Sequence, residues 1–162
     1  MKMSDLDKQL LDTYQQKQRS WGRLLSILKR QFEAWAIAEL ENNGYDDFKM
    51  GYMPLLMNIH PEGITNNELA KTAKVTKQAM SKVVKELVES GYITTEIHGR
   101  DKRSSIISLT TKGKRLVLSA RRKVFDLEKE YEALIGKTKF TELKNTLTRI
   151  MDYHDQKFGS CL

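Results

Sequence analysis

Apolar residues recur three or four positions apart through the first 44 residues of the chain, and this spacing predicts a long amphipathic helix. Ser4 can cap its start and Asn43-Gly44 can end it. We expect a bend or a break near Gly22, beside the polar run at residues 15–18. A helix of about 40 residues is too long for a small domain to cover, so part of its apolar face should contact a partner subunit.

A second helix is predicted from about Asp47 to Asn58, with Pro54 inside it, where a proline can kink a helix. The next helix has a clear start signal. Thr65 and Glu68 form a T-x-x-E capping box, which begins a short helix of about two turns.

After a tight connection of three residues, Thr76 can cap another helix that ends at Gly91. Its apolar positions follow the spacing i, i+3, i+4 and i+7, which predicts one buried face. These positions are Met80, Val83, Val84 and Leu87. Two helices joined by so short a connection are typical of a helix-turn-helix.

The hydrophobic period changes after Gly91 from helical to β-like. Residues 92–97 and 105–109 are rich in β-branched residues, and the intervening residues 98–103 are crowded with cations, so we expect a β-hairpin with a basic tip. Thr110 can then cap a further helix that Gly136 ends, and a last helix carries an apolar seam close to a coiled-coil pattern.

This order of elements predicts a mainly α fold with a small β-hairpin, organised as a winged helix-turn-helix. The expected parts are an N-terminal dimerisation helix (1–44), a DNA-binding domain (45–115) and C-terminal helices that complete the dimerisation region (116–162).

The positive charge of the chain is concentrated in its middle. Residues 61–115 hold 11 Lys and Arg against 6 Asp and Glu, whereas residues 1–60 are neutral and the whole chain carries +7. A basic centre beside neutral flanks favours a polyanionic partner such as DNA, although a generally basic protein with no such partner would carry the same total.

The predicted helix after Thr76 has a polar and cationic face opposite its buried face. Glutamine can bond adenine, serine and threonine can bond either kind of base edge, and lysine can reach guanine or phosphate. Carboxylates are absent there until Glu86, so we interpret the helix as a recognition helix; a solvated surface helix is the alternative. The candidate DNA-binding residues are Thr76, Lys77, Gln78, Ser81, Lys82 and Lys85, with the two last lysines directed to phosphates.

The hairpin tip is the second candidate DNA contact. A cationic finger on a stiff ribbon fits the narrow minor groove, where the negative potential is focused. Asp101 can pair with a neighbouring arginine and fix its direction, although a soluble charged turn would have a similar composition. The candidate wing residues are Arg100, Asp101, Lys102 and Arg103.

The chain resembles the multiple-antibiotic-resistance repressor (MarR) family of winged-helix regulators over the run ITNNELAKTAKVTKQAMSKVVKELVESGYITTEIHGRDKRSSIISLTTKGKRL. The matching motifs are T-x-x-E-L-A, L-x-x-x-G-Y-I, D-K-R and L-T-x-x-G. The resemblance implies an obligate dimer whose first and last helices interlock, with the Thr76 helix in the major groove and the wing in the minor groove. It also implies that Asp101 orients Arg103, while Lys102 stands where many members have arginine.

The sequence and the resemblance together predict a sequence-specific transcriptional regulator that binds double-stranded DNA. We expect a homodimer on a pseudo-palindromic operator, and the resemblance implies a repressor released by a small aromatic or phenolic effector. The candidate dimerisation residues are Leu6, Leu10, Phe140, Leu143, Leu147 and Ile150. The candidate effector pocket consists of Trp21, Arg23, Tyr52 and Met57, although aromatic residues at helical spacing are usually core.

Other classes of function find less support in the sequence. No Gly-rich phosphate loop or His–carboxylate motif occurs and the three histidines lack metal-ligand spacing, so we expect no catalysis, cofactor or metal. The alternative function is a winged-helix module for protein–protein assembly, whose outward helix face should be apolar or mixed in charge. The single cysteine, Cys161, and the absence of a signal peptide or membrane-length apolar run lead us to expect a cytoplasmic protein.

Overall fold

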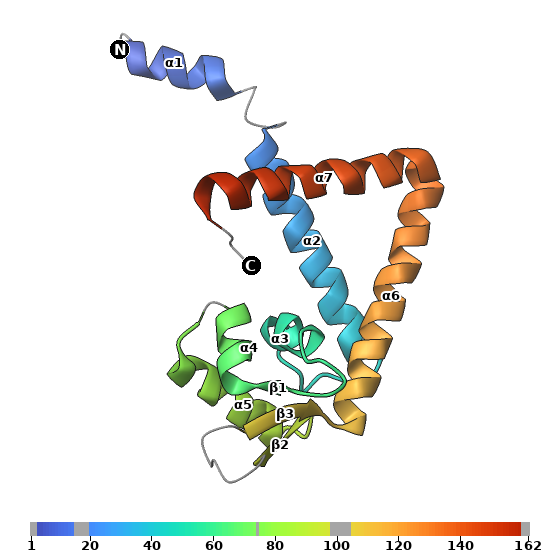
Figure 1. Ribbon diagram of the computed structural model, residues 1–162. Coiled ribbons are helices and arrows are strands. Elements are labelled where there is room, and N and C mark those ends of the chain that lie inside the picture. The colour runs from blue at the N-terminus through green and yellow to red at the C-terminus, as the bar shows by residue number, and fades with distance from the viewer. Residues whose placement is uncertain (1–2, 15–19, 74, 98–104, 160–162) are drawn as a thin grey trace. The chain divides into compact units, whose positions relative to one another are not determined.

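The computed structural model describes residues 3–14, 20–73, 75–97 and 105–159, divided between two units, Met1–Gly44 and Tyr45–Leu162. The first unit holds two helices, α1 (Asp5–Tyr14) and α2 (Trp21–Asn42) (Figure 1). The break expected near Gly22 therefore falls just before Trp21, where Ser20 takes the extended dihedral angles of an N-cap (φ −65°, ψ 141°). The sequence between the two helices has no apolar side chain, so a continuous helix would have nothing to bury there.

The second unit begins with a short helical segment that differs from the predicted helix at 47–58. A 3₁₀ turn, η2 (Met50–Tyr52), leads directly into α3 (Met53–Met57). We expected Pro54 to lie inside a longer helix and to kink it. Instead it occupies the first turn of α3, where a backbone N–H would have no intrahelical partner. The helix consequently starts later and is shorter than the apolar spacing indicated.

Three threonines cap the two helices of the helix-turn-helix and the helix that follows the hairpin, as the sequence predicted. Each hydroxyl accepts a hydrogen bond from the backbone N–H three residues later, and Glu68 completes the capping box at the first cap. The caps and their helices are Thr65 with α4 (Asn66–Thr72), Thr76 with α5 (Lys77–Glu89) and Thr110 with α6 (Thr111–Ile135).

The sheet has three antiparallel strands in the order β1-β3-β2, one more than the sequence predicted. The hairpin strands β2 (Ile93–Ile97) and β3 (Ser105–Leu109) lie where the β-rich runs placed them. The additional strand, β1 (Ile64–Thr65), pairs Ile64 with Ile107. Two residues are too few to show an alternating pattern, so the sequence carries no signal for β1.

The core of the second unit lies where the helix-turn-helix meets the sheet. Ile93 and Ile107 share one face of the sheet, because their register partners are Leu109 and Thr95, and both are buried. The fully buried large side chains are Leu56, Leu69, Met80, Leu87, Tyr92, Ile93, Ile107 and Leu116. They come from α3, α4, α5, β2, β3 and α6 and from the turn before β2, so one cluster fixes the whole winged helix.

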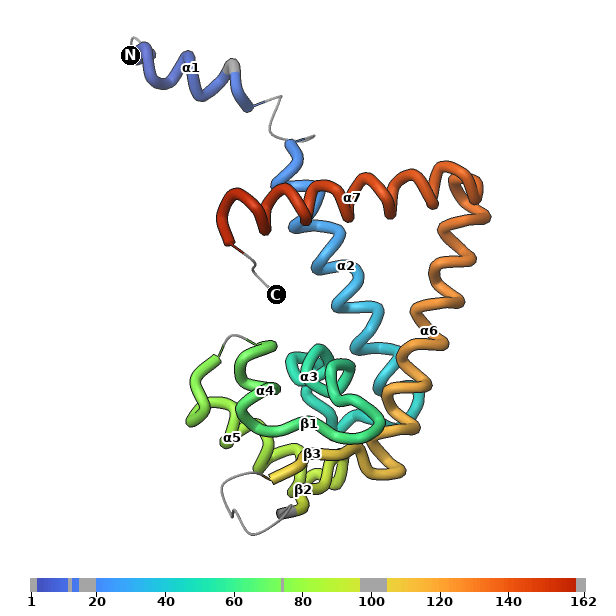
Figure 2. Tube along the Cα trace, viewed as in Figure 1, coloured from blue at the N-terminus to red at the C-terminus, as the bar shows by residue number. Residues whose placement is uncertain are grey.

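A sharp corner separates α6 from α7 (Lys137–Phe158), as the trace in Figure 2 shows. Gly136 makes this corner with φ +89°, a value that favours glycine. Phe140 packs its ring 5.8 Å from the ring of Tyr131, and Lys144 pairs with Glu128 at 3.0 Å across the corner. The domain boundary expected between residues 115 and 116 falls inside α6, which is continuous.

The start of α6 passes unusually close to the start of β2. The Thr110 hydroxyl donates to the carbonyl oxygen of Gly91 at 2.6 Å, and the Thr110 N–H donates to the carbonyl oxygen of Tyr92 at 3.1 Å. A Cβ at Gly113 would overlap that Tyr92 oxygen and lie 3.1 Å from the Tyr92 carbonyl carbon. The L-T-x-x-G motif therefore encodes a cap followed by a close backbone approach.

Tyr92 anchors the same junction through its side chain. Its fully buried phenol donates a 2.6 Å hydrogen bond to Asp47, which also receives the Lys112 ammonium at 2.7 Å. The ammonium lies 4.1 Å from the centre of the Tyr92 ring, within the range of a cation–π contact. The hydrogen bond from Lys112, and then that from Tyr92, lowers the pKa of Asp47, whereas burial raises the pKa of Tyr92.

We expect Gly113→Ala to lower the free energy of unfolding by about 1–3 kcal/mol or more, because the added methyl group must displace the Tyr92 backbone. The matched control is Gly22→Ala, also in the first turn of a helix, where nothing lies within 4 Å of the new Cβ. This control should be neutral or stabilise by up to about 1 kcal/mol through helix propensity. Urea denaturation measures both variants, and equal effects would contradict the close-approach argument.

Candidate nucleic-acid interface

Helix α5 presents one fully exposed polar face. Met80 and Leu87 are buried and Val83 and Val84 half-buried, which turns the opposite side of α5 to solvent. All the predicted recognition residues are exposed. Of these, Gln78, Ser81, Lys82 and Lys85 follow the spacing i, i+3, i+4 and i+7 and therefore share one face of the helix. Thr76 and Lys77 lie at the cap and first position of the helix.

Ser81 also ties the two helices of the motif together. Its hydroxyl donates to the carbonyl oxygen of Lys77 at 2.8 Å and accepts from the side-chain amide of Asn66 on α4 at 3.2 Å. A base-edge contact by Ser81 is then left to its remaining lone pair, which accepts hydrogen bonds from base amino groups. The sequence did not point to Asn66, because the contact joins residues 15 positions apart.

Glu86, the carboxylate that stood closest to the cationic face in the sequence, is held away from it. The Lys49 ammonium donates to this carboxylate at 2.5 Å and the Tyr52 hydroxyl at 2.7 Å. The hydrogen bond from Lys49, followed by that from Tyr52, lowers the pKa of Glu86. We call this contact the Glu86 tether. It fastens α5 to η2 and pairs the negative charge with a cation.

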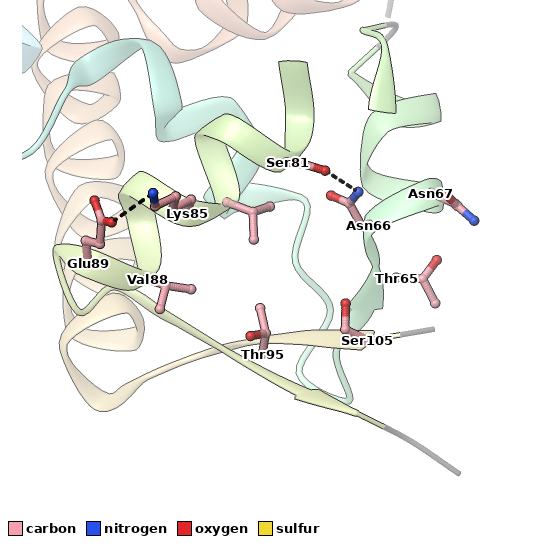
Figure 3. Close-up of a pocket in the computed structure, with 10 residues that line it drawn as sticks. Thr65, Asn66, Asn67, Ser81, Lys85, Val88, Glu89, Thr95 and Ser105 are labelled. Carbon is pink, nitrogen blue, oxygen red and sulfur yellow. Dashed lines mark hydrogen bonds and ion pairs between the residues drawn. The ribbon is translucent and has the colours of Figure 1, made fainter. Parts of the chain in front are cut away.

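A hollow of about 540 Å³ opens between α5, the start of α4 and the strands of the hairpin (Figure 3). We call it the wing groove. Eight of its ten lining residues are polar, and Ser81 and Lys85 belong both to it and to the exposed face of α5. The lining residues are Thr65, Asn66, Asn67, Ser81, Val84, Lys85, Val88, Glu89, Thr95 and Ser105.

The wing groove holds one ion pair, and half of its other polar side chains are engaged: Thr65, Asn66 and Ser81 make side-chain hydrogen bonds. Lys85 and Glu89 lie 3.8 Å apart and are 77% and 63% exposed, so their pairing is weak. Thr95 and Ser105 make no side-chain hydrogen bond with another described residue. The sequence assigned no role to them, because single hydroxyl residues in a strand carry no recognisable signal.

The remaining candidate residues are distributed over both units. The wing residues Arg100, Asp101, Lys102 and Arg103 lie outside the described part of the chain, although the strands that flank them are described. Of the predicted effector pocket, Trp21 and Arg23 are exposed on α2 in the first unit, whereas Tyr52 and Met57 are half-buried in the second. Tyr52 is engaged in the Glu86 tether.

The candidate dimerisation residues differ in exposure. Leu6 and Leu10 on α1 are 71% and 67% exposed, and Leu143 on α7 is 44% exposed. Leu147 and Ile150 on α7 are half-buried. Phe140 is buried within the chain itself, against Tyr131.

Among the described residues, no helix combines the length and apolar character that crossing a membrane requires. The same residues contain no group of three or more His, Cys, Asp or Glu side chains that could hold a metal ion.

Part of the winged helix is similar to a known protein family. Residues 47–104 match the family model described as "MarR family". The chain is 32% identical over 71 residues to the HTH-type transcriptional repressor YetL of Bacillus subtilis (strain 168), covering 44% of this chain and 42% of YetL. It thus spans less than half the length of the curated relative that it matches.

Solved structures share the fold over most of the chain. The Staphylococcus aureus MepR–DNA complex superposes with a TM-score of 0.66 at 20% identity, covering 83% of this chain and 97% of that one. Streptococcus pneumoniae FabT in complex with DNA gives a TM-score of 0.69 at 18% identity, covering 85% and 99%. These similarities confirm the predicted winged-helix fold with its helical flanks.

The Glu86 tether should make stability depend on pH. Because the pKa of Glu86 is lowered in the folded state, the tether stabilises fully above the ordinary glutamate value of 4.5, and this stabilisation is lost as the pH falls through the lowered pKa. We expect Lys49→Met to flatten the fall of the unfolding free energy between about pH 6 and pH 3, and Tyr52→Phe to flatten it less.

Urea denaturation across this pH range measures the effect, and the difference between variants isolates Glu86 from the other carboxylates. Lys29→Met is the matched control, because Lys29 pairs with Glu33 at 3.6 Å on the exposed surface of α2. Its pH profile should parallel that of the wild type. An unchanged profile in Lys49→Met would rule out the tether as a source of pH-dependent stability.

Proposed function

We propose that the protein is a MarR-family transcriptional regulator that binds double-stranded DNA sequence-specifically, because residues 47–104 match the model of that family and 71 residues are 32% identical to a transcriptional repressor. The observation that carries this proposal is the exposed face of α5. Gln78 and Ser81 offer hydrogen bonds to base edges, and Lys82 and Lys85 offer charge to phosphates. Two carboxylates lie next to this face and both have cationic partners: Glu86 is held by its tether, and Glu89 pairs with Lys85 at 3.8 Å.

The related structures give this proposal further support. MepR and FabT were each solved in complex with DNA. The chain shares their fold over most of its length. We therefore propose that α5 enters the major groove, as the recognition helix of a helix-turn-helix does.

The basic wing is proposed as a second contact in the adjacent minor groove. Arg103 would enter that groove with its direction fixed by Asp101, and Arg100 and Lys102 would add positive charge. The described strands β2 and β3 flank this segment in the chain as the two strands of a hairpin, which supports the proposed role of the wing.

We propose a homodimer on a pseudo-palindromic operator, with half-sites about 10–10.5 base pairs apart or a multiple of that. The support is the amount of uncovered apolar surface on the helices outside the winged helix. The exposed large apolar residues on these helices include Leu6, Leu10, Trp21, Leu24, Leu28, Leu143 and Met151. Monomeric proteins rarely leave such stripes uncovered.

We further propose that the dimer represses transcription in the cytoplasm and that a small anionic aromatic molecule releases it. A hollow of about 220 Å³ on the second unit supports an effector of this class. Most of its lining is apolar. Lys114 and Arg121 also line the hollow, and neither has an ion-pair partner among the described residues. The lining residues are Ile59, His60, Pro61, Leu109, Lys114, Val117, Leu118 and Arg121. This hollow differs from the effector pocket predicted at residues 21, 23, 52 and 57.

Selection of bound duplexes from a random pool tests the DNA-binding function. Gln78→Ala should relax the preference at one position of each half-site, worth about 1–3 kcal/mol of discrimination. Lys82→Ala should leave the selected motif unchanged but lower the slope of log affinity against log salt by about one per subunit. Sedimentation should give two chains per duplex.

Lys139→Ala, at an exposed lysine of α7, is the control for loss of charge alone and should bind as the wild type does. If the wild type and Gln78→Ala select the same DNA motif, the assignment of Gln78 to a base edge is wrong. Failure to bind any duplex, together with capture of a protein partner through α5, would favour the assembly module instead.

Benzoate and its neutral counterpart benzyl alcohol test the effector hollow. Benzoate should stabilise the protein by about 1.4 kcal/mol at ten times its dissociation constant, and benzyl alcohol should do so less. Arg121→Ala should weaken the benzoate effect, whereas Arg149→Ala, an exposed arginine of α7, should preserve it. Equal stabilisation by the two compounds in the wild type would exclude a site selective for anions.

A further inference from the structure

The wing groove carries hydroxyl groups on the same face of the sheet that carries apolar core residues. Antiparallel partners share a face, so the pairs Thr95↔Ile107 and Ile97↔Ser105 place Thr95 and Ser105 on the face that carries the buried Ile93 and Ile107. The same face is thus apolar beneath the helices and bears hydroxyl groups toward the wing. Figure 3 shows the Ser105 hydroxyl directed into the hollow, with Thr95 on the same side.

The position of the groove relates it to the two elements proposed to read DNA. It begins at Ser81 and Lys85, where the exposed face of α5 ends, and extends to the strands that lead to the wing. A helix in the major groove and a hairpin in the adjacent minor groove lie on either side of one sugar–phosphate strand. The wing groove is the space between these two elements on the surface of the protein.

We propose that the wing groove seats this sugar–phosphate strand, with the hydroxyls of Thr95 and Ser105 donating hydrogen bonds to phosphate oxygens and Lys85 supplying the charge. The proposal rests on the proposed DNA-binding function and deepens it by assigning a role to residues outside the recognition helix. Neutral hydroxyl donors commonly position a protein on the DNA backbone without reading its sequence.

The ion pair in the groove fits this role. Lys85 is held beside the hollow by Glu89 at 3.8 Å, and both side chains are largely exposed, so the lysine can exchange its weak partner for a phosphate. Asn66 holds α4 against Ser81 by its side-chain amide, which keeps the two helical walls of the groove together.

The experiment uses the full-length dimer and the duplex obtained by selection from the random pool, with single phosphates replaced by neutral methylphosphonates. The wild type should lose about threefold to tenfold in affinity at one phosphate per half-site, between the bases read by α5 and the minor groove protected by the wing. Thr95→Val and Ser105→Ala should each lose about as much on the unmodified duplex and show little further loss at that phosphate.

Thr94→Val and Ser108→Ala are matched controls, because these residues pair with each other on the opposite face of the same strands. They should bind as the wild type does, and melting temperatures report whether each variant is folded. The methylphosphonate scan of the wild type needs no variant, so loss of folding cannot obscure the result.

The proposal is overturned if no phosphate in that interval matters to the wild type, or if the groove variants and their controls lose affinity equally. In either case, if Gln78→Ala still changes the selected DNA motif, the DNA-binding function stands and only the proposed phosphate contact in the wing groove is rejected. Failure of the wild type to bind any duplex would reject both.

Discussion

The close approach of α6 to the Tyr92 backbone is the constraint on which the second unit depends. Position 113 has no room for a side chain, so the first turn of α6 can lie directly against the start of β2. The phenol of Tyr92 then reaches Asp47, and Lys112 joins that carboxylate to the carbonyl oxygen of Ser90 at the end of α5. One junction therefore fixes the end of α5, the first hairpin strand and the start of α6.

The electrostatics of α5 depend on where its carboxylates are held. Two acidic residues, Glu86 and Glu89, lie in its C-terminal half, and both have cationic partners. Lys49 comes from a different segment of the chain, so the net charge around α5 is set partly by the residues that precede α3. The uncompensated cations consequently gather at the N-terminal half of α5, where the side chains suited to base edges also lie.

The features that the sequence predicted are those encoded within a few neighbouring residues. Thr65, Thr76 and Thr110 were identifiable as caps because each bonds a backbone N–H three positions away. The Glu86 tether was not identifiable, because it joins residues 34 and 37 positions apart and depends on the tertiary fold. The wing groove could not be identified from the sequence for a similar reason. Only the register of the hairpin shows that the hydroxyls of Thr95 and Ser105 lie on the face of the sheet that packs into the core.

The corner at Gly136 and the junction at Gly113 lie near the two ends of a single long helix. With 25 residues, α6 measures about 37 Å; its first two turns lie in the core of the second unit, where Gly113, Leu116 and Val117 are buried, and its last turns pack against α7. It can act as a lever arm: a tilt of about 5° at the Tyr92 pivot would move the far end by about 3 Å. The reverse also holds, because the junction shares Lys112 with the end of α5. A displacement of the far end of α6 by a few ångströms would therefore reach α5 as a small change in its angle.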